Sequence, residues 1–201
     1  MPDGYEFDIF LSFPRAGTAF DWVRNHFYPV LVDTLTDELG IEPRIFVFTR
    51  QPTGINWQAN IVGSLRRSRC LVAVWGPPYF RSAWCMAEWE SIRQREQLLG
   101  LGTEQDPRGL IYPIIFHRGV PYPPEALAIY AGEIADLSDW VNPTPGFRDT
   151  GKFQLFFDAM RPVAAELAQL LPQTPPWQPD WPVVTPDPAD SKPVPSVQPR
   201  L

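Results

Sequence analysis

Residues 68–88 read SRCLVAVWGPPYFRSAWCMAE and carry the clearest structural pattern of the chain. Residues 70–75 form an apolar run of strand length without polar alternation, which is typical of a strand buried on both faces of a parallel sheet. Gly76 and two prolines end this run, and residues 82–99 continue in a helical pattern. The stretch therefore predicts a strand, a loop and a helix in succession.

Other apolar runs of strand length flank this segment. They occupy residues 7–13, 44–48 and 110–116, with a weaker candidate at 133–137. Pro113 interrupts the run at 110–116. Because proline cannot donate a hydrogen bond to a neighbouring strand, we expect that strand to lie towards an edge or to carry a bulge.

Helical spacing of apolar residues fills the intervals between the expected strands. The helical segments are residues 20–39, 56–67, 82–99 and 153–170, with bends expected at Pro29 and Pro162. Strands that alternate with helices predict an α/β fold with a doubly wound, mostly parallel sheet and helices on both faces. In such sheets the functional site lies beyond the carboxyl ends of the strands, which directs attention to the loops at 14–18 and 76–81.

Length, charge and cysteine content exclude several protein classes. The chain has 201 residues, the size of one ordinary domain, and a formal net charge of −6, which argues against bulk binding to nucleic acid or an anionic membrane. Cys70 and Cys85 cannot build a disulfide framework, and the start MPDGYE lacks the basic and apolar regions of a signal peptide. No apolar run approaches the roughly 20 residues that span a bilayer. We therefore expect a cytoplasmic protein.

Several familiar catalytic sets are missing from the sequence. His26 and His117 are the only histidines, and neither has cysteines or carboxylates at metal-ligand spacing. Neither a P-loop nor a Gly-x-Gly-x-x-Gly fingerprint occurs. We expect no metal site and no bound redox cofactor.

The middle of the chain is locally cationic. No acidic residue occurs from residue 43 to residue 87, whereas six arginines do: Arg44, Arg50, Arg66, Arg67, Arg69 and Arg81. Trp84 and Glu88 follow, four residues apart on one face of the expected helix. This set of groups suits a nucleotide ligand. The ring can stack on a base, the arginines can pair with phosphate, and the carboxylate can stabilise a cation. Two plainer interpretations stay open: arginine outnumbers lysine throughout the chain, and Glu88 could simply complement the helix dipole.

Two segments resemble a known family. Residues 5–13, YEFDIFLSF, resemble the first box of Toll/interleukin-1 receptor (TIR) domains. Residues 68–88 resemble the central strand, the loop and the Trp-Cys-x-x-Glu helix of the same family. The motifs occur in the family's order and at its interval, and the resemblance covers roughly residues 5–171. We therefore expect a TIR domain at 1–171 and a separate tail at 172–201.

This resemblance implies a flavodoxin-like fold and, as in many bacterial and plant members, cleavage of NAD+ at the nicotinamide–ribose bond. Glu88 would be the catalytic glutamate, and NAD+ would be the substrate. Residues 50–55 would form a mobile loop that governs access. The residues expected to contact the substrate are Trp84, Phe13, Pro14, Arg15, Tyr79, Arg50 and Gly54.

Two departures from the family pattern affect these expectations. Relatives often carry acidic residues just after the second strand, whereas this chain has Thr49-Arg50-Gln51-Pro52. Relatives also often have a basic residue directly after the first strand's aromatic residue, whereas here Pro14 precedes Arg15. Trp57 and Trp75 match no family role, and we assign both to the core because an indole buries a large apolar area.

The family resemblance also implies products and partners. Capture of the ribosyl group by water gives ADP-ribose, and capture by adenine gives a cyclic ADP-ribose isomer. We expect a bacterial immune or antiphage role, activation by assembly into a homo-oligomer or filament, and a separate sensor or effector protein. The alternative is a non-catalytic TIR–TIR interaction module. A nucleic-acid substrate is a third reading, which the net charge disfavours.

The last 30 residues differ in composition, since they hold 10 of the 25 prolines. Trp177 and Trp181 lie among them, and such large rings are unusual in a plain linker. We expect 172–184 to dock on the domain or on a neighbouring protomer, and 185–201 to be flexible. A loose tail with incidental aromatic residues is the alternative.

Overall fold

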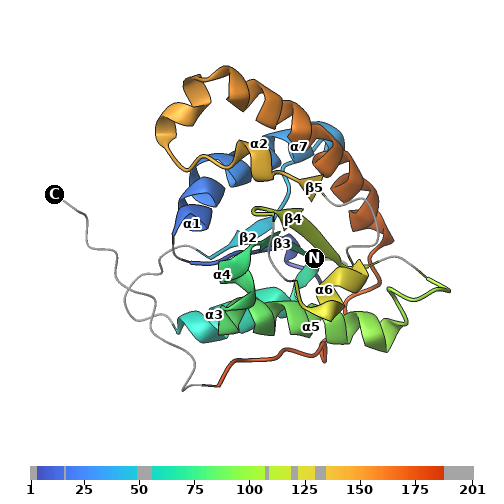
Figure 1. The fold of residues 1–201 in the computed structure, drawn as a ribbon. Coiled ribbons are helices and arrows are strands. Elements are labelled where there is room, and N and C mark those ends of the chain that lie inside the picture. The colour runs from blue at the N-terminus through green and yellow to red at the C-terminus, as the bar shows by residue number, and fades with distance from the viewer. Residues whose placement is uncertain are drawn as a thin grey trace.

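The computed structural model arranges the chain as a parallel sheet with helices on both faces (Figure 1). The structure describes residues 4–15, 17–48, 56–106, 109–118, 122–129 and 135–187. The strands are β1 (Phe7–Ser12), β2 (Ile45–Val47), β3 (Ser68–Trp75), β4 (Ile111–Ile115) and β5 (Ala135–Asp136). The helices are α1 (Thr18–Trp22), the π-helix η1 (Val23–Phe27), α2 (Tyr28–Leu39), α3 (Trp57–Arg66), α4 (Pro77–Phe80), α5 (Ala83–Leu99), α6 (Pro124–Ile129), η2 (Ser138–Trp140), η3 (Pro145–Asp149), α7 (Gly151–Leu170) and η4 (Leu171–Gln173).

The sheet has the strand order β2-β1-β3-β4-β5, and all four strand pairings are parallel. The order reverses between β1 and β3, so the carboxyl ends of these two strands flank the switch point of a doubly wound sheet. The predicted flavodoxin-like α/β fold is confirmed.

Two apolar layers hold the helices on the sheet. Val72 and Val74 of β3 belong to the layer shared with α2 and α7, on one face of the sheet. Leu71 and Trp75 belong to the layer shared with α3 and α5, on the opposite face (Figure 1). Successive residues of a strand point to opposite faces, so a strand covered on both faces must be apolar throughout, as this one is.

The π-helix η1 lies directly before α2, and Pro29 is the second residue of α2. Proline has no N–H and its ring displaces the carbonyl four residues earlier, here that of Asn25. This carbonyl accepts hydrogen bonds from Nε and Nη2 of Arg148 instead, at 3.2 and 2.8 Å. A side chain from η3 therefore replaces the missing backbone donor.

The expectation for Pro113 holds in part, because β4 is not itself an edge strand but adjoins the two-residue edge strand β5. β4 lies between β3 and β5, and its register with β3 runs without a bulge. The carbonyl of Ile115 accepts the N–H of Leu137. The backbone groups of Ile115, and of Pro113 two residues earlier, therefore point away from β3. Among the described residues, β5 pairs with Ile114 and Ile115. The missing donor therefore does not interrupt the ladder with β3.

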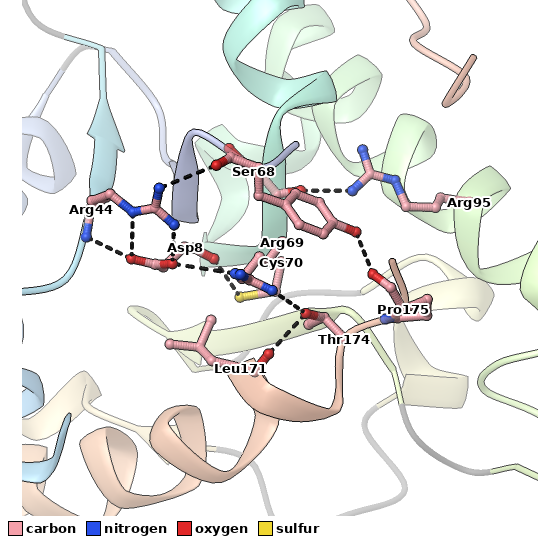
Figure 2. A network of polar contacts seen from close by, with 10 residues as sticks. Asp8, Arg44, Ser68, Arg69, Cys70, Arg95, Leu171, Thr174 and Pro175 are labelled. Carbon is pink, nitrogen blue, oxygen red and sulfur yellow. Dashed lines mark hydrogen bonds and ion pairs between the residues drawn. The ribbon is translucent and has the colours of Figure 1, made fainter. Parts of the chain in front are cut away.

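Residues after α7 return to the amino-terminal ends of β1 and β3, as Figure 2 shows. Nη1 of Arg69 donates to the Thr174 hydroxyl at 3.2 Å, and the Tyr5 hydroxyl donates to the carbonyl of Pro175 at 2.8 Å. The guanidinium of Arg69 also lies 4.8 Å from the ring centroid of Tyr5. These contacts join the two ends of the described chain.

The tail then runs along α5 (Figure 1). Trp181 is 3% exposed and its ring lies 5.0 Å from the guanidinium carbon of the buried Arg95. The backbone N–H of Val184 donates to the Ser91 hydroxyl at 2.8 Å. Residues 172–184 are thus packed on their own domain, whereas the domain boundary at 171 stays a prediction and residues from 188 onward lie outside the described part.

Candidate functional site

The candidate site lies at the carboxyl ends of β1 and β3. Ser82 caps α5, because its hydroxyl accepts the N–H of Cys85 at 3.3 Å. The helix therefore starts at Ala83 and carries Trp84 in its first turn and Glu88 in its second. Since β1 ends at Ser12, this hydroxyl and the loop after it face the start of α5.

Glu88 is buried, with only 3% of its surface exposed. Its Oε2 accepts a hydrogen bond of 2.6 Å from the Ser12 hydroxyl, and its Oε1 accepts one of 3.0 Å from Nη2 of Arg15. The hydroxyls of Ser12 and Tyr79 lie 3.1 Å apart. Because the proton of Ser12 is directed to Glu88, Tyr79 donates to Ser12, and the three groups form a chain that ends on the carboxylate.

Burial raises the pKa of Glu88 above its ordinary value. The charge of Arg15 and the hydrogen bonds from Ser12 and Arg15 oppose this rise only in part. Burial also raises the pKa of Tyr79, which is therefore a neutral hydroxyl at physiological pH. The site thus holds one carboxylate whose charge depends on two named neighbours.

Aromatic rings surround the guanidinium of Arg15. Its central carbon lies 4.1 Å from the ring centroid of Phe48, 5.6 Å from that of Trp57 and 5.7 Å from that of Trp84. The rings of Trp57 and Trp84 are themselves 5.0 Å apart. We call Phe48, Trp57 and Trp84 the aromatic cage. Arg15 bridges this cage and the Glu88 carboxylate.

A family model for the TIR domain matches residues 9–148, more than half of the chain. The chain belongs to the TIR domain family. Among solved structures it is similar to the TIR domains in the structure of the activated Roq1 resistosome directly recognizing the pathogen effector XopQ. That similarity has 17% sequence identity, a TM-score of 0.40 and coverage of 82% of this chain and 85% of that chain. No curated protein matches this TIR domain.

The expected site residues of the TIR domain fall into three groups. The first group comprises Glu88 and three residues around its carboxylate, namely Trp84, Arg15 and Tyr79. Phe13 and Pro14 follow β1 and are buried, with the ring of Phe13 packed in the layer under α2 and α7. Arg50 and Gly54 lie outside the described residues. The roles of all these residues stay predictions.

Three further side chains at the site were not expected from the sequence. Ser12 could have been noticed as a polar residue that closes an apolar strand at its carboxyl end. Trp57 was assigned to the core, but it contacts both Trp84 and Arg15. Phe48 is an aromatic residue of an apolar run, and no sequence signal separates it from core residues.

A cysteine also lies at this site. Cys85 is buried beneath the start of α5, and burial raises the pKa of its thiol to about 12, so that it is not a nucleophile at neutral pH. Among the described residues, no group of three or more histidine, cysteine or acidic side chains is placed to hold a metal ion. In the same part of the chain, every helix is too short or too polar to cross a bilayer.

Proposed function

We propose that this TIR domain is an NAD+ nucleosidase that cleaves the nicotinamide–ribose bond. The observation that carries the proposal is the Glu88 carboxylate, which is buried at the switch point of the sheet beside Trp84 and a cation. A buried carboxylate stabilises a developing positive charge far more than an exposed one, because little solvent screens the interaction. Many bacterial and plant members of the TIR family cleave NAD+. NAD+ is therefore the natural substrate to propose for this chain.

In the proposed reaction, the bond between the ribose C1′ and the nicotinamide nitrogen breaks. Its electron pair stays with nicotinamide, which leaves as a neutral molecule, and the ribosyl group becomes an oxocarbenium ion. The carboxylate of Glu88 holds this cation, and the Ser12 hydroxyl keeps the carboxylate oriented. Water then adds at C1′ and loses a proton to give ADP-ribose. Attack by an adenine nitrogen instead gives a cyclic ADP-ribose isomer.

Activation by assembly belongs to the same proposal. In the described conformation Glu88 is closed off by its pairing with Arg15, so the carboxylate must lose this partner before it can face a ribose. We propose that contacts between TIR domains in a homo-oligomer or filament stabilise the open form. A role in bacterial immune signalling, through a separate sensor or effector, would follow from production of a nucleotide signal.

The test is incubation of the purified chain with NAD+ at low and high protein concentration, with the products identified by mass spectrometry. We expect nicotinamide plus ADP-ribose or a cyclic isomer, formed at a rate per protomer that rises with concentration. Glu88→Gln should lower turnover by about 100-fold or more, because it removes the negative charge that the oxocarbenium ion needs. Glu90→Gln is the control, since Glu90 lies on the same helix but pairs with Arg93. Absence of products from the assembled protein, or full activity of Glu88→Gln, would refute the proposal.

The second candidate is a non-catalytic module that recruits other TIR domains. The observation that favours it is the closure of Glu88 by Arg15, since a scaffold has no need of an accessible carboxylate. The same incubation separates the two functions. A scaffold would form complexes with other TIR domains and leave NAD+ intact at every concentration.

A further inference from the structure

Arg15 occupies a position that resembles a bound ligand more than a structural ion pair. Its planar guanidinium contacts three rings of the aromatic cage and one carboxylate. These groups come from separate parts of the chain: Phe48 follows β2, Trp57 begins α3, and Trp84 and Glu88 belong to α5. Three parts of the fold therefore meet around one small cation.

The chemistry of this enclosure selects a flat cation. The faces of tryptophan and phenylalanine rings attract cations, and a planar, delocalised cation stacks on them better than a compact ammonium does. The buried carboxylate of Glu88 adds a charge that little water screens. A neutral ring of the same shape would keep the stacking and lose both electrostatic attractions.

Arg15 makes fewer hydrogen bonds than Arg95, the buried arginine of α5. Nη2 of Arg15 donates to Glu88, whereas Nη1 is buried and has no hydrogen-bond partner among the described residues. Both Nη atoms of Arg95 donate to backbone carbonyls, those of Ser68 and Leu65, at 2.8 and 3.2 Å, and only its Nε has no partner among the described residues. A buried donor without a partner is costly. Displacement of Arg15 by another cation therefore breaks fewer bonds than displacement of Arg95 would.

We propose that the aromatic cage and Glu88 form a binding site for planar organic cations, and that Arg15 occupies this site as an internal, competing ligand. The identity of the natural ligand rests on the proposed function. Under that function it is the positively charged pyridinium ring of oxidised nicotinamide nucleotides, and the uncharged dihydropyridine ring of the reduced form is excluded. Binding of a planar cation does not depend on that function, because it requires only the aromatic cage and Glu88.

The test is calorimetric titration of two probes of nearly equal shape, N1-methylnicotinamide, which is a cation, and nicotinamide, which is neutral. We expect Arg15→Ala to bind N1-methylnicotinamide about tenfold more tightly than the wild-type chain does, because the internal competitor is removed. The same variant should prefer the cation to nicotinamide by about tenfold. Arg24→Ala, which removes an exposed arginine of η1, is the matched control and should behave as the wild type does.

A second pair of variants tests the cage. In the Arg15→Ala background, Trp57→Ala should weaken binding of N1-methylnicotinamide about tenfold, because it removes one wall. Equal affinities of wild type and Arg15→Ala, no preference for the cation, or no effect of Trp57→Ala would each overturn the proposal.

If Arg15→Ala does not fold, Arg15→Gln replaces it, and the wild-type chain supplies an independent measurement. There, N1-methylnicotinamide at high concentration should shift the indole N–H resonances of Trp57 and Trp84 in NMR spectra, and equal concentrations of nicotinamide should not; absence of this difference also counts against the cage.

Failure of the cage and failure of the proposed function give different results. If Arg15→Ala binds the cation as stated but the assembled wild-type chain does not consume NAD+, the cage stands and the nucleosidase proposal fails. If the wild type consumes NAD+ and Arg15→Ala gains no affinity for N1-methylnicotinamide, the cage proposal fails alone.

Discussion

At the scale of single residues, the charge of Glu88 depends on a short hydrogen bond from Ser12. Burial raises the pKa of this carboxyl group, and the Ser12 hydroxyl, at 2.6 Å, is among the groups that lower it. Both effects act on the ionised form, the form that stabilises a ribosyl cation. Ser12 is therefore a positioning residue whose removal changes the pH at which Glu88 can act.

We predict that Ser12→Ala shifts the acidic limb of the pH profile of kcat/KM for NAD+ to higher pH. The hydrogen bond stabilises the carboxylate, so its loss raises the pKa of Glu88, and a higher pH is then needed to ionise the group. The shift should be about one pH unit, because a hydrogen bond to a charged group contributes about 1.5 kcal/mol or somewhat more and one unit corresponds to about 1.4 kcal/mol. Ser138→Ala, which alters a serine bonded to Asp136, should leave the profile unchanged. A lower rate with an unshifted profile would contradict this role of Ser12.

The sequence predicts the members of the site better than their contacts. The rule that sites lie beyond the carboxyl ends of parallel strands brings Arg15 and Glu88 to one place, and the structure places them together. Their direct pairing depends on side-chain conformations that no spacing specifies. Trp57 is harder still, because an indole that stacks on Arg15 and one that fills a core look identical in a sequence.

At the scale of elements, Glu96 fastens the end of α5 to the start of β4. Its Oε1 accepts the N–H groups of Leu110 and Ile111, at 2.5 and 3.2 Å. A side chain at Gly109 would approach that oxygen to 3.1 Å, so glycine leaves room for the contact. Burial raises the pKa of Glu96 to about 7 in spite of these hydrogen bonds. The helix that carries Glu88 is thus anchored by a second titrating carboxyl group.

We predict that Glu96 makes the folded state less stable as the pH rises from about 4.5 to about 7. In this range the folded chain keeps a proton that the unfolded chain releases, so a rise in pH favours unfolding. The full loss is on the order of 3 kcal/mol, since the pKa lies roughly 2.5 units above its ordinary value. Urea unfolding at pH 5 and pH 8 measures the free energy of unfolding. Between these pH values it should decrease more for the wild type than for Glu96→Gln. The half-buried Glu90 provides the control, and a Glu90→Gln chain that loses as much pH dependence as Glu96→Gln would disprove the assignment.

Strands and helices were predictable from the sequence wherever their apolar pattern extended over many residues. Residues 70–75 lack polar alternation because both faces of β3 are covered, and this is visible in the sequence. The short helices α4 and α6 were not predicted, because elements of four and six residues are too short to show a helical period. The place of Pro113 in the sheet was only partly predictable, because the direction of its missing donor follows from strand pairing, which one strand alone does not reveal.

At the scale of the whole molecule, charged groups close the end of the sheet opposite Glu88. Nη2 of Arg44 donates to Oδ1 of Asp8 at 2.8 Å, and Arg69 reaches the same carboxylate (Figure 2). Burial alone would raise the pKa of Asp8, but the hydrogen bonds from Arg44 and the charges of both arginines bring it below its ordinary value. Arg69 also contacts Thr174. The tail therefore joins a charge network that ties β1 to β2 and β3.

The tail also covers surfaces that belong to other elements. The indole N–H of Trp177 donates to the carbonyl of Arg66 at 3.2 Å, and the ring of Trp177 packs closely over Gly4. Trp181 covers Arg95, whose side chain links α5 to the start of β3. Removing the tail would expose Arg95 and the amino-terminal segment together. The tail thus packs on α5, which also carries the candidate catalytic residue.

We predict that truncation after Thr174 lowers the free energy of unfolding by at least about 3 kcal/mol, whereas truncation after Asp187 leaves it unchanged. The first variant removes Trp181, which is 3% exposed, and deletion of a buried tryptophan side chain typically costs 3–5 kcal/mol. For a chain of this length the expected decrease in Tm is roughly 6–12 °C, measurable by circular dichroism. The second variant keeps the contacts of Trp177, Trp181 and Val184. Trp181→Ala in the full chain should reproduce most of the loss, because Trp181 is the most deeply buried residue in the described part of the tail. Equal Tm values for the two truncations would show that the packed segment adds no stability to the TIR domain.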